Sequence, residues 1–137
     1  MIRDMEPNIS YIEKPVTTDE KQIAALLEQT VTAINTKNLS LLQSVYAEDA
    51  TVRMSTNKLE PMTLQQYLAR LPDLIYKVRH LRMGDIIIHV NDPEAKVLCV
   101  SSLLFHGALN YSSNRRYFKF LKRDGEWRII EAGYYDY

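Results

Sequence analysis

The stretch FKFLKRDGEWRI, residues 118 to 129, is the part of the sequence that decides the fold. Asp124 and Gly125 are the residue types that favour a tight turn between two paired strands. Apolar and polar side chains alternate before the turn, so Arg116, Phe118 and Phe120 share one face of the first strand. The phenylalanines mark that face as buried. The stretch therefore predicts an antiparallel hairpin with one face in a hydrophobic core.

The same alternation extends over the C-terminal half of the chain. Alternating segments are separated by NDPE at residues 91 to 94 and by NYSS at residues 110 to 113, both rich in turn-forming residues. We therefore predict four strands. They cover residues 78 to 90, 95 to 109, 114 to 123 and 126 to 136.

The N-terminal half follows the helical period instead. Thr17 and Glu20 form a capping-box pattern at the start of a first helix of about 16 to 18 residues. Asn38 is a suitable cap for a short second helix, and Thr63 begins a third helix with a second capping box. Residues 51 to 54 read as a short strand. Helices followed by a strand meander predict an α+β fold, with helices on one face of an antiparallel sheet.

The composition indicates a single globular domain. A chain of 137 residues, 46% hydrophobic and 25% charged, has enough apolar surface to fold as one unit. Residues 1 to 16 contain two prolines and show no period. We therefore expect a loose N-terminal arm over residues 1 to 16 and a domain over residues 17 to 137.

Charge and cysteine content argue against several functional classes. Basic and acidic residues number 17 each, so no net field attracts nucleic acid or an anionic membrane. No segment approaches the roughly 20 apolar residues of a membrane helix, which makes the cytoplasm the expected location. Cys99 has no partner for a disulfide, and no spacing of Cys and His suits a metal. We expect no cofactor.

Two segments carry a resemblance to a known family. They are YAEDATV at residues 46 to 52 and FKFLKRDGEWRI at residues 118 to 129. With them, residues 18 to 135 resemble the nuclear transport factor 2-like superfamily, in its polyketide-cyclase-like and ketosteroid-isomerase-like branch. The resemblance implies a cone-shaped, curved antiparallel sheet wrapped around three N-terminal helices. It also implies a pocket open at one end and a homodimer formed through the sheet.

Glu48 and Asp49 are adjacent acidic residues at the point where the hydrophobic period changes. A carboxylate pair suits general acid and base chemistry, but adjacent side chains point in different directions. In the family, the corresponding acidic residue lies at a helix-to-strand turn, where it bonds backbone groups. We interpret the pair as structural.

Ketosteroid isomerases use a carboxylate base, a tyrosine and a protonated acid. The resemblance places Met54 at the base position, Thr30 at the tyrosine position and Arg116 at the position of the neutral acid. All three groups are replaced, so we do not expect proton abstraction by this route. His106 and Tyr134 are the remaining candidates for an acid or base. Each also has a structural interpretation, as a solvated imidazole and as a core tyrosine.

The candidate ligand-binding residues are those that strand alternation or family position turns toward the pocket. They are Thr30, Met54, His106, Arg116, Phe118, Ile130 and Tyr134. Residues 114 to 122 contain no acidic residue that could pair with Arg116. Two interpretations of Arg116 stay open: it pairs with a carboxylate from elsewhere in the fold, or it binds the acid group of a small ligand.

Three functions follow from these patterns. The leading one is a pocket protein that binds a small, partly apolar and acidic ligand. The second is an enzyme of the cyclase, isomerase or dehydratase type, which a closely spaced acid and base in the pocket would favour. The third is a homo-oligomerisation module, which a filled cone would favour. We expect the dimer on the outer sheet face, where alternation places apolar and aromatic residues. These are Tyr117, Leu121, Trp127, Ile129 and Tyr135.

Overall fold

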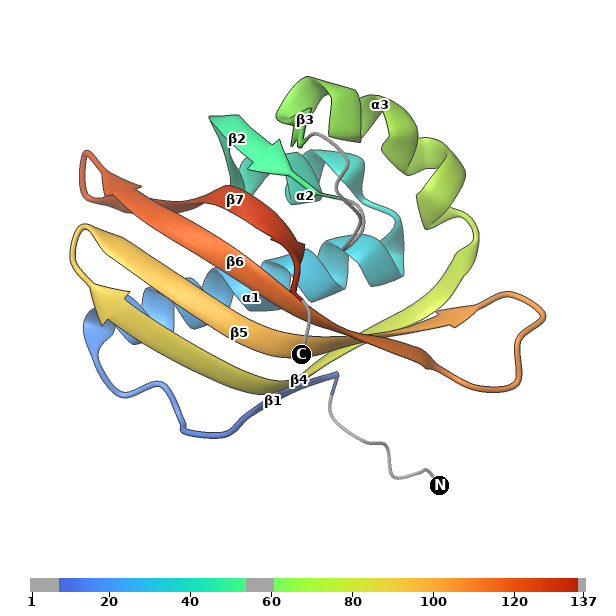
Figure 1. Ribbon diagram of the computed structural model, residues 1–137, viewed down its shortest axis with the longest axis horizontal. Coiled ribbons are helices and arrows are strands. Elements are labelled where there is room, and N and C mark those ends of the chain that lie inside the picture. Colours follow the sequence, from blue (N-terminus) through green and yellow to red (C-terminus); the bar gives the residue numbers. More distant parts are fainter. Residues whose placement is uncertain (1–7, 54–60, 136–137) are drawn as a thin grey trace.

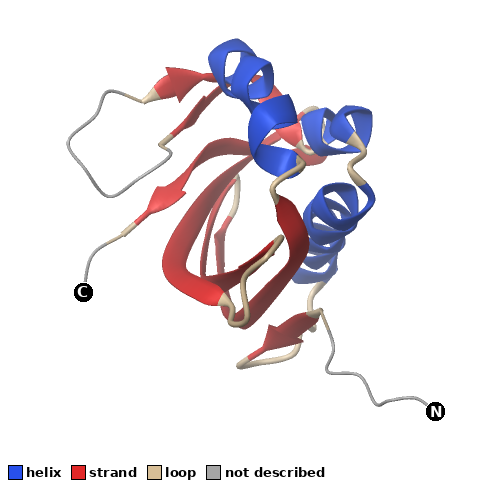
Figure 2. Cartoon of the chain, turned by 90° about the vertical axis from the view of Figure 1, so that its right-hand side faces the viewer, coloured by secondary structure: helices blue, strands red, loops and turns tan. Residues whose placement is uncertain are grey.

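The computed structural model describes residues 8–53 and 61–135, and within them the chain has an α+β fold. The helices are α1 (Thr18–Thr36), α2 (Leu39–Ser44) and α3 (Leu64–Ile75). The strands are β1 (Ile9–Tyr11), β2 (Tyr46–Val52), β3 (Met62–Thr63), β4 (Val78–Asn91), β5 (Glu94–Phe105), β6 (Ser112–Arg123) and β7 (Glu126–Tyr134). They form one sheet in the order β1-β4-β5-β6-β7-β2-β3. The sheet is curved, and the helices lie against its inner face (Figure 1 and Figure 2).

The starts of the helices confirm the predicted capping patterns. The side chain of Thr17 accepts from the Glu20 N–H at 3.1 Å, and Glu20 Oε1 accepts from the Thr17 N–H at 3.0 Å. Thr63 and Gln66 repeat this arrangement at the start of α3. The side chain of Asn38 caps α2. These helix starts are therefore set by local hydrogen bonds that the sequence displays.

Asn35 fastens the C-terminal part of α1 to β4. Its side-chain amide donates to the Leu81 carbonyl at 3.1 Å, and its side-chain oxygen accepts from the Leu81 N–H at 2.7 Å. The pairing of β1 with β4 begins only at Met83, so Leu81 lies beyond the end of β1. The Asn35 amide replaces a strand partner there and holds α1 against the sheet.

The meander from β4 to β7 is antiparallel, as predicted, but the edges of the sheet make it mixed. β1 pairs with β4 and β2 pairs with β7, each in parallel. A parallel neighbour needs a crossover connection instead of a hairpin, and helices lie between the paired strands in sequence. Residues Ile9–Tyr11 of the predicted arm are therefore an edge strand on the body.

Glu48 and Asp49 lie inside β2, not at the predicted helix-to-strand turn. The pairing of β2 with β7 is irregular between Tyr46 and Thr51, and both acidic side chains are exposed there. A bulge of this kind lets consecutive residues face the same side of a sheet. Asp49 accepts two hydrogen bonds from Arg123, at 2.8 and 2.9 Å, which fixes β2 to the β6–β7 hairpin.

A second irregularity overturns the predicted alternation of β7. The register between β6 and β7 shifts between Lys119 and Phe120, so the strand exchanges its two faces at Ile130. Trp127 and Ile129 are only 2% and 0% exposed and belong to the core. Their placement on the outer face was wrong because a bulge cannot be read from alternation. The homodimer stays a prediction, and these two side chains no longer support it.

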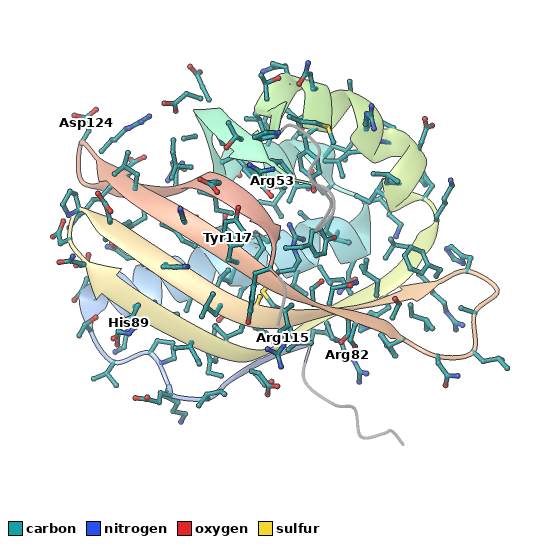
Figure 3. All side chains as sticks on the ribbon, in the orientation of Figure 1. Arg53, Arg82, His89, Arg115, Tyr117 and Asp124 are labelled. Carbon is teal, nitrogen blue, oxygen red and sulfur yellow. The ribbon has the colours of Figure 1, made fainter. Side chains whose placement is uncertain are left out.

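The outer face of the sheet carries a polar cluster around Tyr117 (Figure 3). Tyr117 donates to Glu131 at 2.6 Å, and Lys119 lies 3.7 Å from the same carboxylate. Partial burial, together with Glu131, raises the pKa of Tyr117 to about 12. The Tyr117 ring covers Gly133, where an added Cβ would lie 2.8 Å from the phenol oxygen. A larger residue at this position would therefore have to displace the Tyr117 ring.

The end of the cone near the N-terminus of α1 is closed by polar contacts. Asp19 accepts from the Trp127 indole at 3.0 Å and from Lys122 at 3.3 Å. Lys122 also donates to Asp92 at 3.4 Å. One network therefore joins α1 to the turn between β4 and β5 and to the hairpin of β6 and β7. We call these four side chains the closed-end network.

The described ranges 8–53 and 61–135 contain neither a membrane-spanning helix nor a metal-binding cluster. No helix in these ranges is long and apolar enough to cross a membrane. Nor do they contain a group of three His, Cys, Asp or Glu side chains placed to hold a metal ion. Cys99 is free and buried on β5, as its apolar surroundings in the sequence indicated.

Candidate functional site

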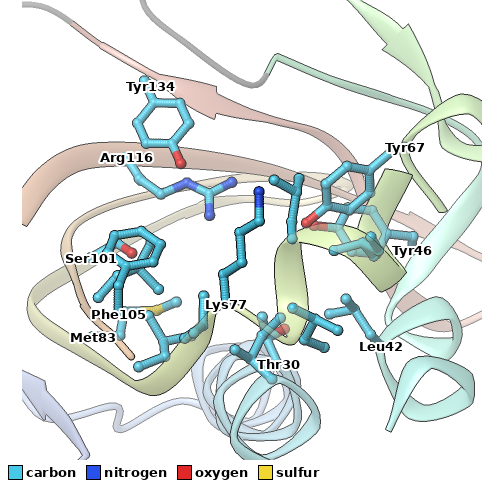
Figure 4. A pocket seen from close by; sticks show the side chains of 17 residues that line it. Thr30, Leu42, Tyr46, Tyr67, Lys77, Met83, Ser101, Phe105, Arg116 and Tyr134 are labelled. Carbon is cyan, nitrogen blue, oxygen red and sulfur yellow. The ribbon is translucent and has the colours of Figure 1, made fainter. Parts of the chain in front are cut away.

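A cavity of about 220 Å³ lies between the inner face of the sheet and helices α1, α2 and α3. Figure 4 shows it from close by. Its lining is mostly apolar, and the lining residues, all within the described part of the chain, include no Asp, Glu or His. They are Thr30, Ile34, Leu42, Tyr46, Tyr67, Leu71, Leu74, Ile75, Lys77, Val78, Leu81, Met83, Ser101, Leu103, Phe105, Arg116 and Tyr134.

Arg116 brings a positive charge into this apolar space. Its guanidinium carbon lies 4.9 Å from the centre of the Phe118 ring and 4.7 Å from that of Tyr134. Its Nε lies 3.5 Å from the Gly133 carbonyl oxygen, at the limit of a hydrogen bond. Burial lowers the pKa of Arg116, but its interactions with nearby tyrosines and with Cys99 outweigh this, and the pKa is raised. The group is therefore a cation at neutral pH.

No carboxylate within residues 8–53 and 61–135 forms an ion pair with Arg116. Ion pairs in this part of the chain join other cations, such as Lys122 with Asp19 and Arg123 with Asp49. The groups that act on Arg116 are Tyr134 and other neutral hydroxyl and thiol groups. The N–H donors of the Arg116 guanidinium therefore lie at the cavity and beside aromatic rings. They have no anionic partner among the described residues.

Tyr46 and Tyr67 lie beside each other on another wall of the cavity. Their ring centres are 6.0 Å apart, with the rings tilted by 54°. Burial raises the pKa of both phenols, that of Tyr46 well above its ordinary value. Both are therefore neutral at physiological pH, and they can donate hydrogen bonds but cannot accept a proton as bases.

Lys77 adds a second cation at the cavity. It lies in the connection between α3 and β4, and its side chain is exposed. Figure 4 shows the side chain extending across the cavity toward Arg116. Its backbone carbonyl accepts from the His106 N–H at 3.0 Å, which ties this connection to the loop after β5. The cavity lining therefore carries two positive charges and is otherwise uncharged.

The structure brings three of the predicted site residues together at the cavity: Thr30, Arg116 and Tyr134. The hydroxyl of Thr30 already donates to the Leu26 carbonyl at 2.9 Å, a bond within α1. Met54 lies outside the described residues. The three that share the cavity come from α1, β6 and β7.

The other predicted residues lie elsewhere. Phe118 is fully buried in the core, and its ring centre lies 4.9 Å from the Arg116 guanidinium carbon. Ile130 does not line the cavity because the bulge in β7 turns it to the other face of the sheet. His106 is exposed in the loop between β5 and β6, which agrees with the solvated interpretation.

Sequence reasoning missed four polar residues of the lining: Tyr46, Tyr67, Lys77 and Ser101. Tyr46 is the first residue of β2, directly after the short helix α2. Tyr67 is a buried residue of α3. The alternation of VLCVSSLLF would have placed Ser101 on the buried face with Cys99, whereas nothing in the sequence distinguishes Lys77.

The family comparison covers most of the chain. The model of the SnoaL-like domain matches residues 15–132. A search of the curated proteins found no match to this sequence. The match spans every described element from α1 to β6 and most of β7, so it includes every lining residue of the cavity except Tyr134.

Solved structures agree with this assignment. A Pseudomonas putida protein of unknown function, described as nuclear transport factor 2-like, has a TM-score of 0.75, 13% identity and 88% coverage of both chains. A second nuclear transport factor 2-like protein of unknown function, from Shewanella oneidensis, has a TM-score of 0.74 and 18% identity, with 87% of this chain and 100% of that chain covered. A Nostoc punctiforme protein with a cystatin-like fold has a TM-score of 0.67 and 17% identity, with 88% of this chain and 93% of that chain covered. These identities support the fold alone. The fold is nuclear transport factor 2-like, and the chain belongs to the SnoaL-like domain family.

Proposed function

We propose that this protein binds a small organic acid with an apolar body, and that Arg116 holds the acid group. The observation that carries the proposal is the position of Arg116 at an apolar cavity whose described lining contains no acidic residue. An unpaired charge in such surroundings is unfavourable by several kcal/mol. A bound carboxylate would remove this penalty, because a guanidinium matches it with two parallel hydrogen bonds.

The remaining lining supports the same ligand class. The positive charge of Lys77 would also attract the acid group, and the hydroxyls of Tyr67 and Tyr134 can donate hydrogen bonds to it. The apolar residues of α3, β4 and β5 suit a hydrocarbon body. A cavity of about 150 Å³ accepts benzene, so one of about 220 Å³ accommodates a single ring with small substituents.

The alternative functions receive less support from these features. A cyclase, isomerase or dehydratase needs a base, and the described lining contains no carboxylate or imidazole. The buried phenols of Tyr46 and Tyr67 stay protonated, so they can polarise a ligand oxygen but cannot abstract a proton. A pure oligomerisation module was expected to have a filled cone, whereas this cone holds an open cavity.

The test is a titration of benzoate into the protein by calorimetry, supported by thermal shift. We expect wild type to bind benzoate and Arg116→Ala to bind it at least tenfold more weakly, because a hydrogen bond to a charged group contributes about 1.5–3 kcal/mol. Arg116→Lys should be intermediate, since it keeps the charge but loses the planar fork.

Arg123→Ala is the matched control for these titrations. Arg123 is on the same strand as Arg116, but it is exposed and paired with Asp49. Its removal should leave benzoate affinity within twofold of wild type, in line with the screening of exposed ion pairs. Equal affinities of wild type and Arg116→Ala would contradict the proposal, as would a wild type that responds to no small acid.

A further inference from the structure

Ser101 is a buried polar residue of the cavity whose hydroxyl has no hydrogen-bond partner in the described part of the chain. It lies on β5, is only 3% exposed and lines the cavity. Within residues 8–53 and 61–135 its Oγ forms no hydrogen bond with another group of the protein. Buried hydroxyls are normally hydrogen-bonded, and each exception calls for an explanation. Figure 4 shows Ser101 on the cavity wall, on the far side of Arg116 from Tyr46 and Tyr67.

The other hydroxyl groups nearby show how unusual Ser101 is. Thr30 donates to a carbonyl of its own helix at 2.9 Å. Ser102, the next residue on β5, has its Oγ 2.7 Å from the Ser113 hydroxyl. Ser101 differs from these two residues because it is enclosed and has no partner among the described residues, so its hydroxyl can bond a molecule in the cavity.

The register of the sheet places Ser101 close to Arg116. Cys99 pairs with Arg116 across β5 and β6, and Ser101 pairs with Asn114. Ser101 and Arg116 are thus diagonal neighbours on the inner face, and such residues are about 7 Å apart. Met83, the β4 partner of Ser101, and Phe105 provide apolar wall beside it. The Ser101 hydroxyl and the Arg116 guanidinium therefore border the same cavity.

We infer that the ligand is a single-ring acid that carries a hydroxyl group, with its carboxylate on Arg116 and its hydroxyl hydrogen-bonded to Ser101 Oγ. This inference rests on the proposed function, because it places the acid group on Arg116. The serine hydroxyl both donates and accepts, so it can pair with an alcohol or a phenol. Ser101 is then a specificity residue that distinguishes a hydroxy acid from the parent acid.

The experiment compares benzoate with 2-, 3- and 4-hydroxybenzoate, by calorimetry, on wild type and Ser101→Ala. A neutral hydrogen bond corresponds to about threefold to tenfold in affinity. We expect at least one hydroxybenzoate to bind wild type more tightly than benzoate by this factor and to lose the advantage in Ser101→Ala. Benzoate itself should bind the two proteins within twofold.

Ser102→Ala is the control, because it removes a hydroxyl from the same strand that bonds to Ser113 instead. It should leave every affinity within twofold of wild type. If benzoate binds through Arg116 but no hydroxybenzoate distinguishes wild type from Ser101→Ala, the inference is overturned and the proposed function stands. If no acid binds, or Arg116→Ala binds as wild type does, the proposed function fails and the inference fails with it.

Discussion

Lys122 and Arg116 lie on the same face of β6, near its opposite ends, and their surroundings differ completely. Lys122 donates to Asp19 and Asp92, and its ammonium lies 5.7 Å from the centre of the Trp127 ring. Arg116 faces tyrosines and an open cavity, without a carboxylate from the described residues. One strand thus places a fully paired cation at the closed end and a cation available to a ligand at the open end.

This difference indicates that the closed end contributes to stability and the open end to ligand binding. At the closed end, three elements are joined by bonds that the folded chain itself completes, so substitutions there should reduce stability. At the open end, Arg116 has no carboxylate partner and Ser101 has no hydrogen-bond partner among the described residues, and a bound ligand would supply both. Functional sites are commonly the places where a fold leaves such groups unsatisfied.

The largest expected effect separates the two ends by truncating one aromatic residue at each. Trp127→Ala should lower the free energy of unfolding by about 3–5 kcal/mol, because it opens a core cavity and removes the donor to Asp19. Phe105→Ala should have a clearly smaller effect, since Phe105 is 38% exposed at the open end. Urea unfolding measures both. Similar losses would show that the two ends contribute equally to the free energy of unfolding.

The next effect concerns the strand that supports Arg116. Gly133→Ala should lower the free energy of unfolding by about 1–3 kcal/mol through overpacking, because its Cβ would lie 2.8–2.9 Å from atoms of Tyr117. In a Tyr117→Ala background the same substitution should have little effect. A loss that persists in that background would place the strain elsewhere than in this contact.

The third prediction compares the two cations directly, by urea unfolding without ligand. Arg116→Leu should leave the free energy of unfolding unchanged or raise it by up to about 2 kcal/mol, because an unpaired charge is replaced by an apolar group. Lys122→Leu should lower it, because Asp19 and Asp92 lose their shared partner. A greater loss of stability for Arg116→Leu than for Lys122→Leu would reverse the comparison.

The smallest effect is a pH dependence at the closed end. The hydrogen bond from Trp127, with a further contribution from Lys122, lowers the pKa of Asp19 in the folded state. A lowered folded pKa contributes stability above the unfolded pKa of about 3.9, and this is lost as pH falls through the folded pKa. The stability advantage of wild type over Asp19→Asn should therefore be constant from neutral pH down to about pH 5 and shrink below about pH 4.

Unfolding measured in urea between pH 7 and pH 3 checks this dependence. The advantage of wild type should be smaller at every pH in a Trp127→Phe background, where the indole donor to Asp19 is absent. An advantage that stays constant down to pH 3 would mean that the Asp19 carboxylate gains nothing from the closed-end network.

Some parts of the candidate site could be predicted from sequence, and others could not. Arg116 was predicted because strict alternation with Phe118 and Phe120 turns it inward, and the β5–β6 register has no irregularity there. Ile130 was misplaced because a bulge exchanged the faces of β7. Tyr46 was missed because it lies at the junction where α2 ends and β2 begins, and no local pattern marks that junction as part of the cavity.

The sequence by itself determined the elements, because caps, turns and hydrophobic period are local. The capping boxes at Thr17 and Thr63, the Asp124–Gly125 turn and the strand alternation each act within a few residues. Only the tertiary structure decided which polar groups meet a partner. Lys122 meets Asp19 across more than a hundred residues of sequence, whereas Arg116 meets no carboxylate of the described chain. Such pairings depend on bulges and on the packing of distant elements, which no local pattern encodes.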